Sequence, residues 1–122
     1  MSLDTFKQNI IDFIDELYKQ SSYNEFIIAH IYIDNKLDIK NCMDSCIKDI
    51  EQFKLCSKNK DMDSLLQLSM LNDHSIFLRK LWYSSLLDNS DKEIIWKWIE
   101  LIIYDIIQYQ TNCEIELIKK ND

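Results

Sequence analysis

Four cysteines are the residues best suited by type to chemistry in this chain, as metal ligands or as a redox pair. Cys42 and Cys46 stand one helical turn apart, so a helix would present two thiolates to one ion. Cys46 and Cys56 are separated by the nine residues of half a CX9C motif. The other half is missing, and Cys113 has no partner at either spacing. Because Cys42 and Cys46 fall on an apolar face, where free cysteine is a small hydrophobe, we expect four reduced packing residues, no metal and no cofactor.

The histidines and serines form no recognisable catalytic motif. His30 lies in an apolar run, and we expect it at the edge of the core with one ring nitrogen hydrogen-bonded, whereas His74 lies in a polar turn and is expected in solvent. Neither has a carboxylate or cysteine at a spacing typical of a catalytic or metal-binding pair. The chain has no Gly, which excludes the nucleophile elbow and the Gly-rich phosphate loop. We therefore predict no catalytic, cofactor-binding or metal-binding residues, and a protein that is not an enzyme.

The charge balance favours a protein partner. The formal net charge is −7 and the sequence pI is about 4.7, so phosphate backbones and anionic lipids are repelled. One basic cluster, formed by Lys54, Lys58 and Lys60, would contact too few phosphates for useful affinity at physiological salt. We expect neither nucleic-acid binding nor membrane binding.

The apolar segments predict a core and not a membrane span. The N-terminus carries no apolar signal region, so we expect an intracellular, reducing location. The most apolar stretch contains Lys97, Glu100 and Asp105 within the roughly 20 residues that a spanning helix needs.

The elements that position these residues are expected to be helices, since the chain has neither Gly nor Pro, the residues that mark hairpins and tight turns. We predict an all-α, compact single-domain bundle over residues 1–122, with about six helices around a hydrophobic C-terminal helix at residues 90–109. Ser90 and Glu93 have the spacing of a capping box at its start. Its apolar residues fill a wide arc, so several helices must cover it: Ile95, Trp96, Trp98, Ile99, Ile102, Ile103, Ile106, Ile107 and Tyr109.

Apolar spacing of three and four residues predicts the other helices. Ser22 and Glu25 form a second apparent capping box, Ser57 to Asp61 is expected to be a loop, and Thr111 with Glu114 is expected to cap a last turn. The predicted helices are Leu3–Lys19, Tyr23–Asp34, Asp38–Leu55, Met62–Leu71 and Ser75–Leu86. An alternative pairs residues 23–34 with residues 113–118 as a two-stranded ribbon, since the first is rich in β-branched residues and the second alternates apolar and acidic side chains.

The segment from Phe77 to Ile107 resembles a motif of uncharacterised proteins from nucleocytoplasmic large DNA viruses, the giant-virus and algal-virus group. It contains Phe77-Leu78, Leu81-Trp82, a Ser-rich linker at Ser90, and Ile95-Trp96-Lys97-Trp98-Ile99. Phe53 to Leu66 lies where the family often has an aromatic and Pro-containing segment, but that Pro is absent here, and the resemblance carries no catalytic residues. It implies a viral helical protein, located in the host cytoplasm or the virion.

Three functions are therefore considered. The first is a non-enzymatic viral interaction protein, virion-associated or host-modulating, that binds a host or viral protein or a second copy of itself. The second is a viral Bcl-2-like protein whose groove captures an amphipathic host helix, although the Asn-Trp-Gly-Arg signature is absent. The third is a nucleic-acid or virion-core packaging factor, which the acidic charge disfavours.

Overall fold

The computed structural model describes residues 2–121, and over that range every regular element is a helix. This confirms the predicted all-α class. The ribbon alternative is wrong, because residues 24–34 and 113–118 lie in helices. The elements are α1 (Leu3–Ser21), α2 (Asn24–Asn35), α3 (Ile39–Lys48), α4 (Ile50–Asn59), α5 (Met62–Leu65), the 3₁₀ helix η1 (Asn72–His74), α6 (Ser75–Trp82) and α7 (Asn89–Asn121).

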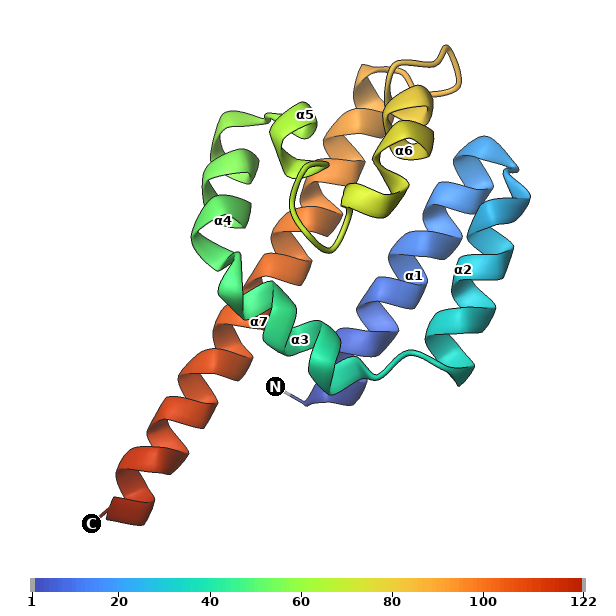
Figure 1. The fold of residues 1–122 in the computed structure, drawn as a ribbon. Coiled ribbons are helices and arrows are strands. Elements are labelled where there is room, and N and C mark those ends of the chain that lie inside the picture. Colours follow the sequence, from blue (N-terminus) through green and yellow to red (C-terminus); the bar gives the residue numbers. More distant parts are fainter. Residues whose placement is uncertain (1, 122) are drawn as a thin grey trace.

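Helix α7 is the element on which the others pack. Helices α1, α3 and α4 contact its N-terminal two thirds, which confirms the expected covering from several directions (Figure 1). The predicted arc is correct, with one part of it buried and the rest half-buried. The buried members are Ile95, Trp96, Ile99, Ile103 and Ile106, and the half-buried members are Trp98, Ile102, Ile107 and Tyr109.

Two of the predicted capping boxes are assigned to the wrong residues. Helix α7 is capped by Asp88 and Asp91, because the Asp91 amide donates to Asp88 Oδ1 at 2.8 Å and the Asp88 amide donates to Asp91 Oδ2 at 3.0 Å. Ser22 does not cap α2. It ends α1 in the left-handed region, with φ 59°, and its amide donates to the Tyr18 carbonyl.

The predicted helix Asp38–Leu55 is two helices that meet at Asp49. Asp49 has φ −103° and ψ 12°, which ends α3 and begins α4 with a change of direction (Figure 1). Asp38 caps α3 by accepting from the Asn41 amide at 3.1 Å. The expected apolar face is nonetheless correct on both sides of the break, as Cys42, Met43 and Phe53 are buried.

The region between α4 and α7 is less helical than predicted. Helix α4 continues to Asn59 through most of the expected loop, and Asp61 caps the short helix α5 by accepting from the Ser64 amide at 3.1 Å. The predicted helices at 62–71 and 75–86 end early, at Leu65 and Trp82. Ile76, the second residue of α6, is 83% exposed.

Helix α7 continues well past the predicted end at residue 109. It runs unbroken to Asn121, so Thr111 and Glu114 cap nothing. At about 1.5 Å per residue the helix is about 50 Å long. Its C-terminal part projects from the rest of the molecule, as the red end of the ribbon shows (Figure 1).

Candidate partner-binding surface

Helix α2 exposes more apolar surface than packing requires. Phe26 and Ile33 are buried on its inner side, and Phe26 also lies against Phe77 of α6, with ring centroids 5.4 Å apart. A helix that is apolar on all sides is normally covered on all sides. The outer side of α2 is uncovered, and its exposed residues are Ile27, Ile28, Ile31 and Tyr32.

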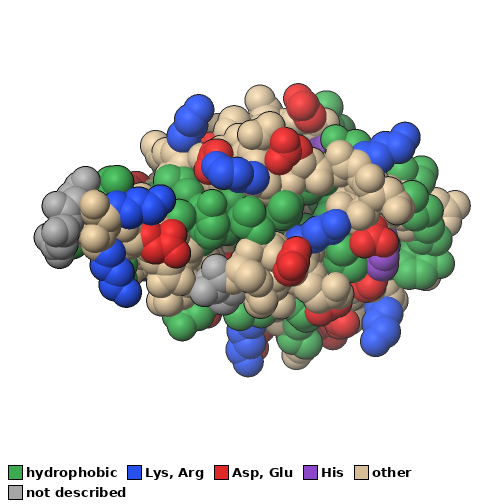
Figure 2. Space-filling view, turned by 90° about the horizontal axis from the view of Figure 1, so that it is seen from below, with side chains coloured by type: hydrophobic (Ala, Val, Ile, Leu, Met, Phe, Trp, Pro, Cys, Tyr) green, Lys and Arg blue, Asp and Glu red, His purple; other side chains and the backbone are tan. Residues whose placement is uncertain are grey.

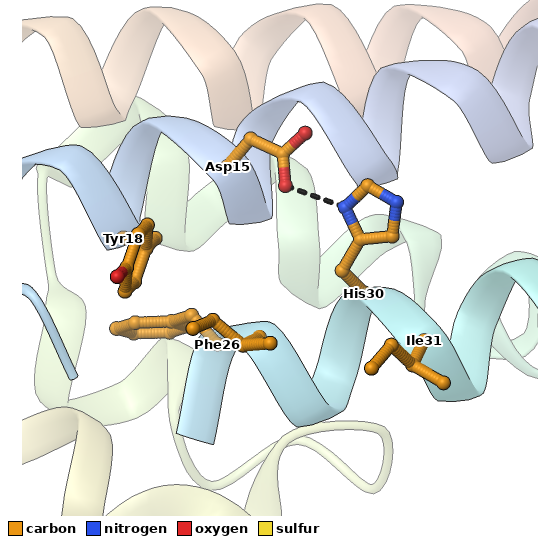
Figure 3. Close-up of a pocket in the computed structure, with 6 residues that line it drawn as sticks. Asp15, Tyr18, Phe26, His30 and Ile31 are labelled. Atoms are coloured by element: carbon orange, nitrogen blue, oxygen red, sulfur yellow. Dashed lines mark hydrogen bonds and ion pairs between the residues drawn. The ribbon is translucent and has the colours of Figure 1, made fainter. Parts of the chain in front are cut away.

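A hollow of about 260 Å³ lies between α1 and α2, and this hollow together with the outer side of α2 is called the α1–α2 face below. The hollow is lined by Asp15, Tyr18, Phe26, Ile27, His30 and Ile31. Figure 3 shows the rings of Tyr18 and Phe26 at one end and the side chains of Asp15 and His30 turned toward each other at the other. The floor is therefore apolar and one wall is polar.

The polar wall is a pair that joins the two helices. His30 Nδ1 lies 2.6 Å from Asp15 Oδ1, so the expectation of one hydrogen-bonded ring nitrogen at the core edge is confirmed. An Asp–His pair is two thirds of a hydrolytic triad. The residues that line the hollow include no Ser, Thr or Cys to act as the nucleophile. The pair is therefore suited to fixing α2 against α1 and to offering a hydrogen bond to a bound group.

The electrostatic surroundings of the α1–α2 face are acidic. Helices α1 and α2 carry six carboxylates and two lysines. One of those lysines, Lys7, donates to the Asp34 carbonyl at 2.9 Å. Figure 2 shows hydrophobic side chains gathered at the end of the molecule where α2 lies in Figure 1, with acidic side chains beside them. A ligand with apolar and basic groups matches such a surface.

The basic cluster is largely engaged within the molecule. Lys60 Nζ lies 3.0 Å from Glu100 Oε1 and 5.4 Å from the centroid of the Trp96 ring. Lys54 Nζ lies 3.4 Å from Glu51 Oε1. The cluster therefore offers an approaching polyanion less free positive charge than the sequence suggests.

The tryptophans belong to the packing of α7. Trp82 meets Trp96 edge to face at 5.8 Å, and Phe13 stacks on Trp98 at 5.9 Å. Such aromatic pairs stabilise a fold by about 0.5–1.5 kcal/mol beyond the area that they bury. This confirms the core assignment of Trp96, whereas Trp98 is half-buried at the edge of the packing.

Three of the four cysteines are packing residues. Cys42, Cys46 and Cys56 are buried, whereas Cys113 is exposed on α7, which corrects the expectation that all four lie in the core. A hydrogen bond with Cys42 and burial both raise the pKa of Cys46, and burial raises the pKa of Cys56. These two thiols therefore stay protonated and unreactive at neutral pH.

Asp105 is a buried charged residue on the core side of α7. Asp105 is 1% exposed, and its Oδ2 accepts from Asn9 Nδ2 at 2.6 Å. No described residue donates a hydrogen bond to its Oδ1. This pair ties α1 to α7 across a large sequence separation.

Two negative findings concern residues 2–121. Within this range no three His, Cys, Asp or Glu side chains are arranged to hold a metal ion. Nor does any described helix combine the length and the apolar character that a membrane crossing requires.

His74, expected in solvent, is exposed at the end of η1.

Comparison of the chain with protein-family models, with curated protein sequences and with solved structures found no match.

The sequence contains one signal for the α1–α2 face. The run from Phe26 to Ile33 places apolar residues on every side of a short helix, which indicates an uncovered face. The pairing of Asp15 with His30 has no local signal, because it depends on how α1 and α2 turn back on each other.

Proposed function

We propose that this protein is a non-enzymatic interaction protein whose α1–α2 face binds a basic amphipathic helix of a partner protein. The observation that carries the proposal is the outer side of α2, where Ile28 is 66% exposed between two further exposed isoleucines. Contiguous apolar surface of this kind marks interaction sites on soluble domains. The hollow beside it offers an apolar floor for one anchoring side chain of the partner.

The acidic surroundings define the partner further. A helix that places apolar residues on α2 would bring its own flanks close to the carboxylates of α1 and α2. Lysine or arginine on those flanks would be attracted, and Asp15 beside His30 offers a carboxylate for such a contact. Helix-in-groove recognition follows this pattern of apolar anchors on one side of the bound helix.

The origin and setting belong to the same proposal. The motif from Phe77 to Ile107 supports a large DNA virus as the source, with the partner supplied by the host or by the virus. The engagement of Lys54 and Lys60 with carboxylates speaks against the packaging alternative. A mobility-shift titration at physiological salt tests that alternative, and specific submicromolar binding of DNA or RNA would favour it instead.

The test uses two labelled model peptides that differ in charge. Both are amphipathic helices with leucine on one face, and the other face carries lysine in one peptide and glutamate in the other. We expect fluorescence anisotropy to show tighter binding of the lysine peptide. Ile31→Lys on the outer side of α2 should weaken that binding at least about tenfold, equivalent to about 1.4 kcal/mol.

The matched control is Ile76→Lys. Ile76 is an exposed isoleucine on α6 that neither lines the hollow nor belongs to the outer side of α2, and the substitution adds the same charge. It should leave peptide binding unchanged. Equal losses in the two variants would mean that net charge alone attracts the peptide, and the proposal would then be wrong.

A further inference from the structure

The projecting part of α7 exposes an apolar stripe that continues along the helix onto the body of the protein. The residues from Thr111 to Lys120 are exposed except for half-buried Asn112. Within them, Ile115 and Ile118 are exposed, as are Leu101 and Tyr104 farther back on the same helix. Leu101 and Tyr104 are three residues apart, as are Ile115 and Ile118, and the step from Tyr104 to Ile115 makes about three helical turns, so all four lie on one side of α7.

This side of α7 faces away from the core. The core side is formed by Ile95, Ile99 and Ile106, which are buried against α1, α3 and α4. Positions 101, 104, 108, 111, 115 and 118 follow one another in steps of three and four, the spacing of a coiled-coil seam. We call these six positions the α7 stripe. A helix with such a seam normally packs against another helix along it.

The α7 stripe is complementary to itself. Its steps are the same in both directions, so a second α7 laid antiparallel matches it position by position. Leu101 then faces Ile118 of the second copy, Tyr104 faces Ile115, and Gln108 faces Thr111. Apolar residues meet apolar residues at both ends, and the two polar residues meet at the centre.

The charges decide between an antiparallel and a parallel pair. The chain carries a net charge of −7, and a parallel pair would place two acidic bodies side by side at the same end. An antiparallel pair places the bodies at opposite ends. Each body then receives the projecting segment of the other copy, which is neutral because Glu114 and Glu116 are balanced by Lys119 and Lys120.

We propose that the protein forms a homodimer in which two α7 helices pack antiparallel along the α7 stripe, each projecting end covering Leu101 and Tyr104 of the other copy. This interface is separate from the α1–α2 face, because α1 lies between α2 and α7 (Figure 1). The dimer and the binding of a partner helix can therefore be tested independently.

Light scattering of the full chain after size exclusion tests the dimer. We expect a mass close to twice 14.7 kDa. Ile118→Lys should reduce it to the monomer mass. The matched control is Leu117→Lys, because Leu117 and Ile118 are both 62% exposed but Leu117 lies off the α7 stripe. The control should remain a dimer, and circular dichroism should show unchanged helix content in both variants.

Cross-linking tests the orientation. In a Cys113→Ser background, Tyr104→Cys and Ile115→Cys are prepared as separate proteins. Oxidation should produce a disulfide-linked dimer when the two are mixed and not when either is oxidised alone. Cross-linking of Ile115→Cys with itself would show a parallel pair. A monomeric parent chain would show that something other than a second copy covers the α7 stripe. Loss of the dimer in Leu117→Lys would place the interface on another face. Each of these results overturns the proposal.

Discussion

The buried pair between Asn9 and Asp105 is the contact whose removal has the most informative consequence. Replacing Asn9 by Leu leaves both carboxyl oxygens of Asp105 without a partner in a site that is 1% exposed. A hydrogen bond to a carboxylate contributes about 1.5–3 kcal/mol, and an unpartnered buried group bears the full cost of desolvation. We therefore expect Asn9→Leu to lower the free energy of unfolding by about 2–3 kcal/mol.

The corresponding double variant should behave differently. When both partners of a buried polar pair become apolar, the change is nearly neutral or stabilising. Asn9→Leu with Asp105→Leu should therefore restore the free energy of unfolding to within about 1 kcal/mol of the parent chain or raise it. The double-mutant cycle should give a coupling energy of at least about 1.5 kcal/mol.

Urea denaturation followed by circular dichroism measures Asn9→Leu, Asp105→Leu and the double variant. For a chain of this size, about 2–3 kcal/mol corresponds to a melting temperature lower by roughly 6–15 °C. Gln8→Leu is the control, because Gln8 is exposed on α1 and bonds to Asp12 within the same helix. Its effect should stay within about 0.5 kcal/mol. An Asn9→Leu variant as stable as the control would refute the reasoning.

Three further predictions concern the core, the thiols and a helix cap. Trp96→Ala should lower the free energy of unfolding by about 3–5 kcal/mol, because Trp96 is buried against Trp82, and an unchanged thermal melt would contradict this. A thiol-specific disulfide reagent should react quickly with Cys113 alone in the folded protein and with all four cysteines in denaturant, and fast reaction of a second thiol in the folded state would show that Cys42, Cys46 or Cys56 is accessible. Hydrogen bonds from the Ser64 hydroxyl, which has the larger effect, and from the Ser64 amide lower the pKa of Asp61 below its unfolded value of about 3.9. The Asp61 carboxylate therefore stabilises the fold above that pH, and this contribution is lost as the pH falls through the folded pKa. The stability difference between the parent chain and Asp61→Asn should therefore be constant from pH 7 to pH 5 and close below about pH 4, and a difference that persists there would show that the charge is not its cause.

The sequence predicted the helical class from the absence of Gly and Pro, and it predicted the core face of α7 because that face depends on local periodicity. The break at Asp49 was missed for the same reason, as Ile47, Ile50 and Phe53 keep the helical spacing across it. The extension of α7 was missed because the pair Thr111 and Glu114 imitates a helix start. The capping box that begins α7 is formed by Asp88 and Asp91. Each carboxylate accepts a hydrogen bond from the backbone amide of the other residue, which is a less familiar form of capping box than Ser with Glu.

The α1–α2 face depended on information that periodicity does not contain. Ile28 is exposed because no described helix covers the outer side of α2. His30 pairs with Asp15 because the turn at Ser22 brings α2 back against α1. The α7 stripe was present in the spacing of Leu101, Tyr104, Ile115 and Ile118. It was divided by the predicted end of the helix at residue 109, which assigned its two halves to different elements.

A chain without glycine still has to end helices in the left-handed region, and it does so at Ser22 and Lys60, with φ of 59° and 54°. For residues with a Cβ this conformation costs about 1–2 kcal/mol. The two positions differ in what the side chain contributes, since Lys60 contacts Glu100 and Trp96 whereas Ser22 is an exposed turn residue. A change of the Ser22 codon to one for glycine would therefore increase the heat tolerance of this chain. The glycine would relieve the backbone strain at this position and leave the α1–α2 face and the α7 stripe unchanged.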